Sequence, residues 1–185
     1  MKGARRQLVI WLGVAVVLVA IALLLPGDVV FVLAGAAWGL GLAGFVARGR
    51  YGKARALLSA KQYEAAFDEL LAFEQQVRRD GWRRSLAFLY TGFHTGDPLA
   101  LARCYQGVVR LEQGRLVEAE ALLKGVVELD QAYGLAWANR AIVAASMGDE
   151  PSARAHERLA RQNGVTGATL ARTIAAALSK TTPTN

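Results

Sequence analysis

Residues 101–126, LARCYQGVVRLEQGRLVEAEALLKGV, decide the fold, because residues 135–160, LAWANRAIVAASMGDEPSARAHERLA, repeat their pattern 34 positions later. In each stretch, apolar residues recur at helical spacing on both sides of a glycine, Gly114 or Gly148. Each stretch therefore predicts two helices joined by a short turn. Identical or similar residues pair at Leu101/Leu135, Ala102/Ala136, Val108/Ile142, Val109/Val143, Gly114/Gly148, Ala119/Ala153, Ala121/Ala155 and Val126/Ala160.

A weaker third copy lies upstream at a shift of 53 positions. Ala66 then aligns with Ala119, and Lys61 takes the place of the turn glycine Gly114. A repeat period of 34 residues indicates stacked helix pairs. Such a stack needs a terminal cap over its last apolar face. We therefore expect an all-α domain over 51–180, with repeats at about 51–80, 100–133 and 134–165, an insert at 81–99, a capping helix at 168–179 and a disordered tail at 181–185.

The small residues of these copies resemble the tetratricopeptide repeat (TPR) family. The resemblance rests on Gly107 and Ala141 in the first helices, Gly114 and Gly148 in the turns, Ala119 and Ala153 in the second helices, with Leu123, Val126, Ala160 and Trp137 in support. The family pattern departs at Gln131 and Val165, where a repeat usually ends in proline. The resemblance implies a short α-solenoid.

The resemblance also implies a protein-binding groove, because the first helices of successive repeats line the concave face in this family. The matching residues here are Leu101, Cys104, Val108, Leu111, Leu135, Ala138, Ile142 and Ala145. An apolar lining of this kind suits the amphipathic helix of a partner protein. The chain's own insert or its C-terminal helix is the other occupant that fits.

Two uncharged apolar runs near the N-terminus predict a transmembrane helical hairpin within residues 1–50. The runs at 8–25 and 29–47 are each long enough, as helices, to cross the hydrocarbon core of about 30 Å. Pro26, Gly27 and Asp28 lie between them and predict a tight turn. One alternative is a buried hairpin of a soluble protein, for which no comparably apolar partner segment exists. The other is a cleaved signal peptide, but the first run is longer than a usual signal-peptide core, and a second span with basic residues after it follows.

The net charge of +7 is concentrated beside these runs. Residues 1–55 contain seven of the 22 basic residues but only one acidic residue, Asp28, whereas the remainder is nearly balanced. Basic flanks at both open ends predict that both ends are cytoplasmic, with the repeat domain beneath a bacterial plasma membrane. Expected membrane-surface contacts are Arg48, Arg50, Lys53, Arg55, Trp82 and Arg83. The arginines around Trp82, which are Arg78, Arg79, Arg83 and Arg84, are explained equally well as a solvated helix end. The distribution gives no basic stripe for nucleic acid.

Gly35 and Gly39 form a GxxxG pattern in the second run. Small residues at this spacing let two membrane helices approach closely. We expect this ridge to pack against the first span of the same hairpin, with oligomerisation through Gly35 and Gly39 as the alternative.

The sequence offers little that predicts catalysis. Cys104 stands among apolar neighbours on a repeat helix, where a small buried residue is expected, and His94 and His156 share no metal-ligand spacing. We expect His156 on a helix surface. No cofactor, metal or small-molecule substrate is expected, and the chain is not predicted to be an enzyme.

These observations favour a membrane-anchored adaptor that binds another protein at the cytoplasmic face. The alternative is a structural accessory subunit, whose hairpin packs against a larger membrane enzyme or transporter. Helical repeats are compatible with either function.

Overall fold

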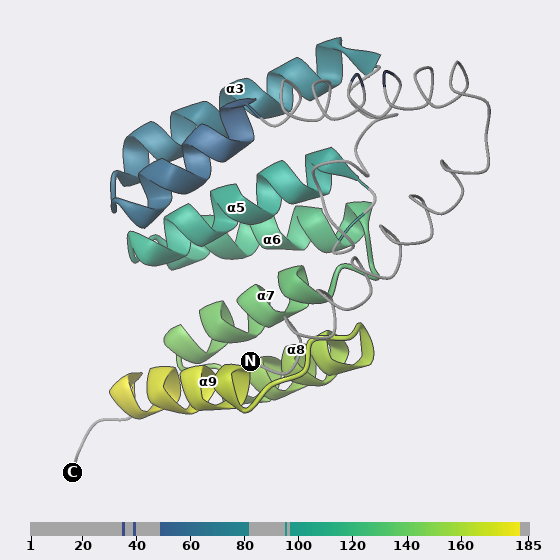
Figure 1. Cartoon of the computed structure of the whole chain (residues 1–185). Helices are drawn as coiled ribbons and strands as arrows, with labels where there is room; N and C mark the ends of the chain where they lie inside the picture. Colours follow the sequence, from purple (N-terminus) through teal and green to yellow (C-terminus); the bar gives the residue numbers. More distant parts are fainter. Residues whose placement is uncertain (1–34, 36–38, 40–48, 82–94, 96, 182–185) are drawn as a thin grey trace, which may run out of the picture. The chain divides into compact units, whose positions relative to one another are not determined.

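The computed structural model describes residues 35, 39, 49–81, 95 and 97–181 (Figure 1). Every regular element in this part of the chain is an α-helix, which confirms the predicted all-α class there. One helix includes residues 49–59. It is followed by α3 (Tyr63–Arg79), α5 (Pro98–Glu112), α6 (Leu116–Leu129), α7 (Gly134–Ser146), α8 (Glu150–Gln162) and α9 (Ala168–Thr181).

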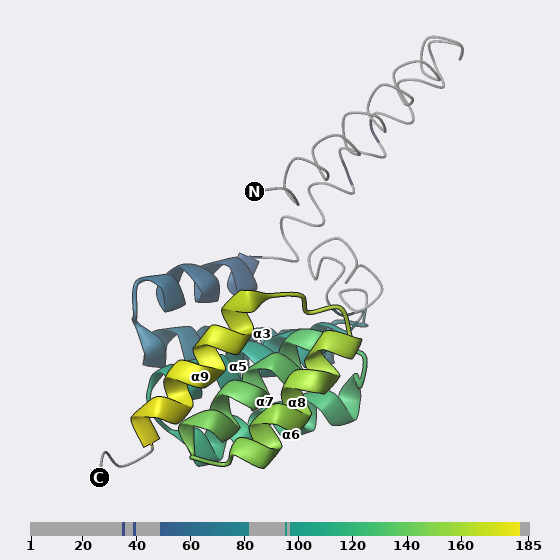
Figure 2. The ribbon, with the colours of Figure 1, turned by 90° about the horizontal axis from the view of Figure 1, so that it is seen from below.

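The helices form a repeat-like stack of hairpins. The 49–59 helix pairs with α3, α5 with α6 and α7 with α8, and α9 packs on α7 and α8 (Figures 1 and 2). The hairpins follow one another through contacts of α3 with α5 and of α6 with α7. Helix α9 spans 168–181 and covers the last hairpin, at the position expected for a cap.

Four helices, namely the 49–59 helix, α5, α7 and α8, are each followed by a residue in the left-handed conformation. Lys61, Gly114, Gly148 and Gly164 have positive φ angles of 58°, 72°, 80° and 85°. The next residue in each case donates its backbone N–H to the carbonyl five residues back, as in Arg115 to Arg110 at 2.8 Å and Asp149 to Ala144 at 2.9 Å. This left-handed cap favours glycine, because only glycine lacks the Cβ that strains the conformation.

Two helices begin with an aspartate cap. The Asp97 carboxylate accepts a hydrogen bond from the Leu99 backbone N–H at 2.9 Å, directly before Pro98 at the start of α5. Asp149 accepts from the Ser152 N–H at 3.0 Å at the start of α8. Both caps satisfy backbone donors that have no partner within the helix.

Small residues lie where the helices of a hairpin cross. Ala66, Ala119 and Ala153 occupy equivalent positions in the three hairpins, and each is fully buried. In the central hairpin, a Cβ on Gly107 would lie only 2.7 Å from the Leu123 Cγ, so α5 and α6 could not pack this closely with a larger residue there.

The chain divides into two compact units, Met1–Ala43 and Gly44–Asn185. The predicted spans at 8–25 and 29–47 lie outside the described residues except for Gly35 and Gly39, and so does most of the predicted insert. Gly35 and Gly39 are helical and exposed, and a Cβ on either would meet no atom within 4 Å. Among the residues that the structure does describe, no helix combines the length and apolarity needed to cross a membrane.

Candidate functional site

Half of the residues expected to line the groove are buried within the stack. Leu101, Cys104, Ala138 and Ala145 are all at most 5 % exposed. Leu101, Cys104 and Ala145 belong to the apolar cores of the stack rather than to an open face. The sequence pattern shows that these positions are apolar, but it does not predict how closely the helices approach one another there.

The other four residues have different surroundings, although Val108 and Leu111 lie one turn apart on the same face of α5. Val108 lines a cleft of about 250 Å³ beside Leu58 and Tyr63, at the turn between the 49–59 helix and α3. Ile142 packs into the apolar cluster that includes Ile174 of α9. Leu111 packs against the central core, and Leu135 is exposed. Two clefts of the stack contain one residue each of the expected lining, Val108 and Leu135.

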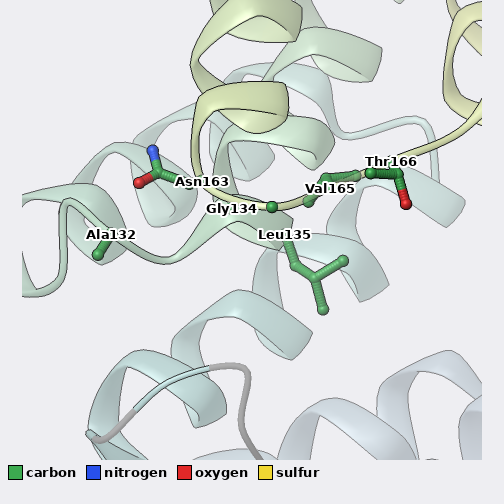
Figure 3. A pocket seen from close by; sticks show the side chains of 7 residues that line it. Ala132, Gly134, Leu135, Asn163, Val165 and Thr166 are labelled. Carbon is green, nitrogen blue, oxygen red and sulfur yellow. The ribbon is translucent and has the colours of Figure 1, made fainter.

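Leu135 lies in a second cleft, of about 420 Å³, where the α6–α7 turn meets the loop between α8 and α9 (Figure 3). Its other lining residues are Ala132, Gly134, Asn163, Gly164, Val165 and Thr166. Gly134 allows this close approach, because a Cβ there would lie 2.5 Å from the Asn163 carbonyl oxygen. No pattern in the sequence predicted this cleft, although the turn glycine Gly164 belongs to the loop that lines it.

A buried carboxylate joins the first hairpin to the second. Glu74 accepts hydrogen bonds from Arg103 Nε and Gln106 Nε2, both at 3.0 Å, and from Arg78 of its own helix at 2.8 Å. Burial by itself raises the pKa of Glu74, but these hydrogen bonds outweigh it, and the pKa lies below its ordinary value. The sequence did not reveal this cluster, since its members lie 29 and 32 positions apart.

An aromatic cluster occupies the corresponding place between α6, α7 and α8. Trp137 lies 5.5 Å from the His156 ring and 5.3 Å from the Arg140 guanidinium, and Arg140 Nε donates to Glu120 at 3.0 Å. His156, which was expected on a helix surface, is partly exposed, and Trp137 of α7 packs against its ring. Burial lowers the pKa of His156, with Arg140 adding to the effect.

Cys104 has the structural environment of an inert thiol. It is 2 % exposed, and its Sγ accepts a hydrogen bond from Asn139 Nδ2 at 3.5 Å. Burial raises the pKa of the Cys104 thiol to about 11, so the reactive thiolate is scarce at neutral pH. Burial likewise raises the pKa values of the neighbouring Tyr51 and Tyr133. Within the described part of the chain, no group of side chains could hold a metal ion.

The expected membrane-surface residues are only partly within the described chain. Arg50 and Lys53 both pair with Glu69, and Arg55 lies 5.9 Å from the Tyr51 ring centre. The other three, Arg48, Trp82 and Arg83, lie outside the described residues. Arg50 is thus held against α3 of the first hairpin by its ion pair with Glu69.

Comparison with known proteins gives no relative. No family model matches the chain, and neither the curated proteins nor the solved structures contain a match to it.

Proposed function

We propose that this chain is a membrane-anchored helical-repeat adaptor that binds another protein at the cytoplasmic face. The uncharged runs at 8–25 and 29–47, with basic residues at both open ends, support the anchor and its orientation. The stack of hairpins supports the binding role, since such arrays present extended surfaces to protein partners. The TPR resemblance points the same way.

One observation carries the proposal: an exposed apolar side chain stands in a cleft of the stack. Leu135 is 36 % exposed and lines the cleft of about 420 Å³ together with Val165. Binding energy in protein interfaces concentrates where an apolar side chain is desolvated within a pocket. We therefore place the partner contact at Leu135, rather than along the whole of the predicted groove.

The test compares two exposed apolar residues. Leu135→Asp introduces a charge into the cleft, whereas Val117→Asp introduces the same charge on α6, where Val117 is 74 % exposed and outside the cleft. Leu135 lies in the first turn of α7, where an aspartate is compatible with the helix dipole, so folding should be preserved. The measurement is co-purification of tagged full-length protein from native membranes.

We expect Leu135→Asp to reduce the recovery of a stoichiometric partner by about tenfold or more, and Val117→Asp to retain it. Equal recovery with both variants would contradict the contact site. If no protein co-purifies with the intact chain, the adaptor proposal fails. A chain that is degraded whenever its partner is deleted would instead indicate an accessory subunit.

A further inference from the structure

A basic cleft lies on the first hairpin, away from the Leu135 cleft. It encloses about 310 Å³ and is lined by Arg50 of the 49–59 helix and by Ala72, Gln75, Gln76 and Arg79 of α3. The α3 residues are spaced at i, i+3, i+4 and i+7 and therefore form one stripe along the helix. Two guanidinium groups and two amide groups thus surround an alanine.

The charges around this cleft favour an anion. Arg50 shares the Glu69 carboxylate with Lys53, so two cations face one negative charge. Arg79 pairs through its Nε with the adjacent Asp80 at 3.0 Å and remains 79 % exposed. No carboxylate is among the described residues that line the cleft. The net charge around the cleft is therefore positive. The guanidinium and amide groups of the lining also supply many hydrogen-bond donors.

The donor set fits a phosphate group. Guanidinium groups present paired N–H donors that match the oxygens of a phosphate, and amides donate further hydrogen bonds. Neither the Gln75 nor the Gln76 side chain makes a hydrogen bond within the described part of the chain. A volume of about 310 Å³ lies at the small end of the range for ligand sites, about 300–1,000 Å³, and so suits a headgroup rather than a whole lipid.

The position of Arg50 in the chain indicates which kind of molecule carries the phosphate group. It stands three residues after 47, where the proposed second span ends. Even a fully extended chain covers only about 10 Å over three residues, so Arg50 would lie at the depth of the lipid headgroups. We propose that the Arg50–Arg79 cleft binds the phosphate of an anionic phospholipid headgroup. This inference rests on the proposed membrane anchor.

The experiment uses the full-length chain purified in neutral detergent. Native mass spectrometry measures retention of phosphatidylglycerol, with phosphatidylcholine as the zwitterionic lipid and inorganic phosphate as the free anion. Arg50→Gln and Arg79→Gln each remove one cleft cation. Arg158→Gln removes a cation from the exposed surface of α8 and serves as the matched control. Circular dichroism verifies that each variant is folded.

We expect each cleft variant to weaken phosphatidylglycerol binding about fivefold, with Arg158→Gln unchanged and phosphatidylcholine bound more weakly by the intact chain. Equal binding by the cleft and control variants would overturn the site. If inorganic phosphate binds as tightly as phosphatidylglycerol, the lipid assignment is wrong. Carbonate extraction of native membranes tests the anchor separately: release of the intact chain would refute the proposed anchor, whatever the variants do.

Discussion

The first hairpin differs from the two that follow, although all three share one internal design. Ala66, Ala119 and Ala153 are buried at equivalent crossings, and each hairpin turns through a residue of positive φ. That turn residue is Lys61 in the first hairpin, where Gly114 and Gly148 stand in the others. The packing inside a hairpin is thus held constant while its turn chemistry varies.

The junctions between hairpins differ more. At the first junction, Glu74 of α3 binds Arg103 and Gln106 of α5. The sequence shifts place Val127 of α6 and Trp137 and Arg140 of α7 at the corresponding positions of the second junction. Val127 lies in the central apolar core, Trp137 packs against that core, and Arg140 pairs with Glu120. The second junction therefore has an apolar residue at the position of the buried Glu74 carboxylate, which indicates that hairpin shape is constrained more tightly than junction chemistry.

The largest expected effect tests whether the three hairpins are packed alike. Ala66→Glu, Ala119→Glu and Ala153→Glu should each lower the free energy of unfolding by about 4 kcal/mol or more, through overpacking and a buried unpaired charge. Urea denaturation of the full-length chain in detergent, followed by circular dichroism, measures this. Ala121→Glu, at an exposed alanine on α6, is the matched control and should change it by no more than about 0.5 kcal/mol. Similar losses in all four variants would refute the shared packing.

An intermediate effect separates the two junctions. Glu74→Ala should cost about 3 kcal/mol, because Gln106 and Arg103 lose the charged partner of buried hydrogen bonds. Val127→Ala, which removes two methyl groups at the equivalent place, should cost about 1–2 kcal/mol. The same denaturation measurement applies to both.

A double variant checks the cause of the Glu74 effect. Combining Glu74→Ala with Gln106→Ala should cost at least about 1 kcal/mol less than the sum of the single changes, because the two residues share one hydrogen bond. Additive losses would show that the cluster does not act as a unit.

The smallest effect concerns the turns. Lys61→Gly should raise the free energy of unfolding by about 1 kcal/mol, since glycine relieves the left-handed strain at φ 58°. Gly114→Ala and Gly148→Ala should each lower it by about 1 kcal/mol for the same reason. A loss of stability in Lys61→Gly would mean that the lysine side chain contributes more than its backbone strain costs.

Much of the fold was predictable from local patterns. The turn glycines, the Asp97–Pro98 start of α5 and the small residues at the crossings are signals that a few neighbouring residues carry. The candidate site was less predictable. Leu135 belonged to the expected lining, but Val165 and Asn163, which meet it in the cleft, belong to a loop about 30 positions away.

The sequence by itself determined which segments are helical, where they turn and which positions must be small, because these depend on periodicity and backbone conformation within one hairpin. Only the tertiary structure decided which apolar residues stay exposed and which charges meet. Leu101, Cys104, Ala138 and Ala145 are buried because neighbouring helices approach them, and Arg50 faces Arg79 because the 49–59 helix pairs with α3. Such contacts join residues far apart in the chain, so their energies depend on packing that no local pattern specifies.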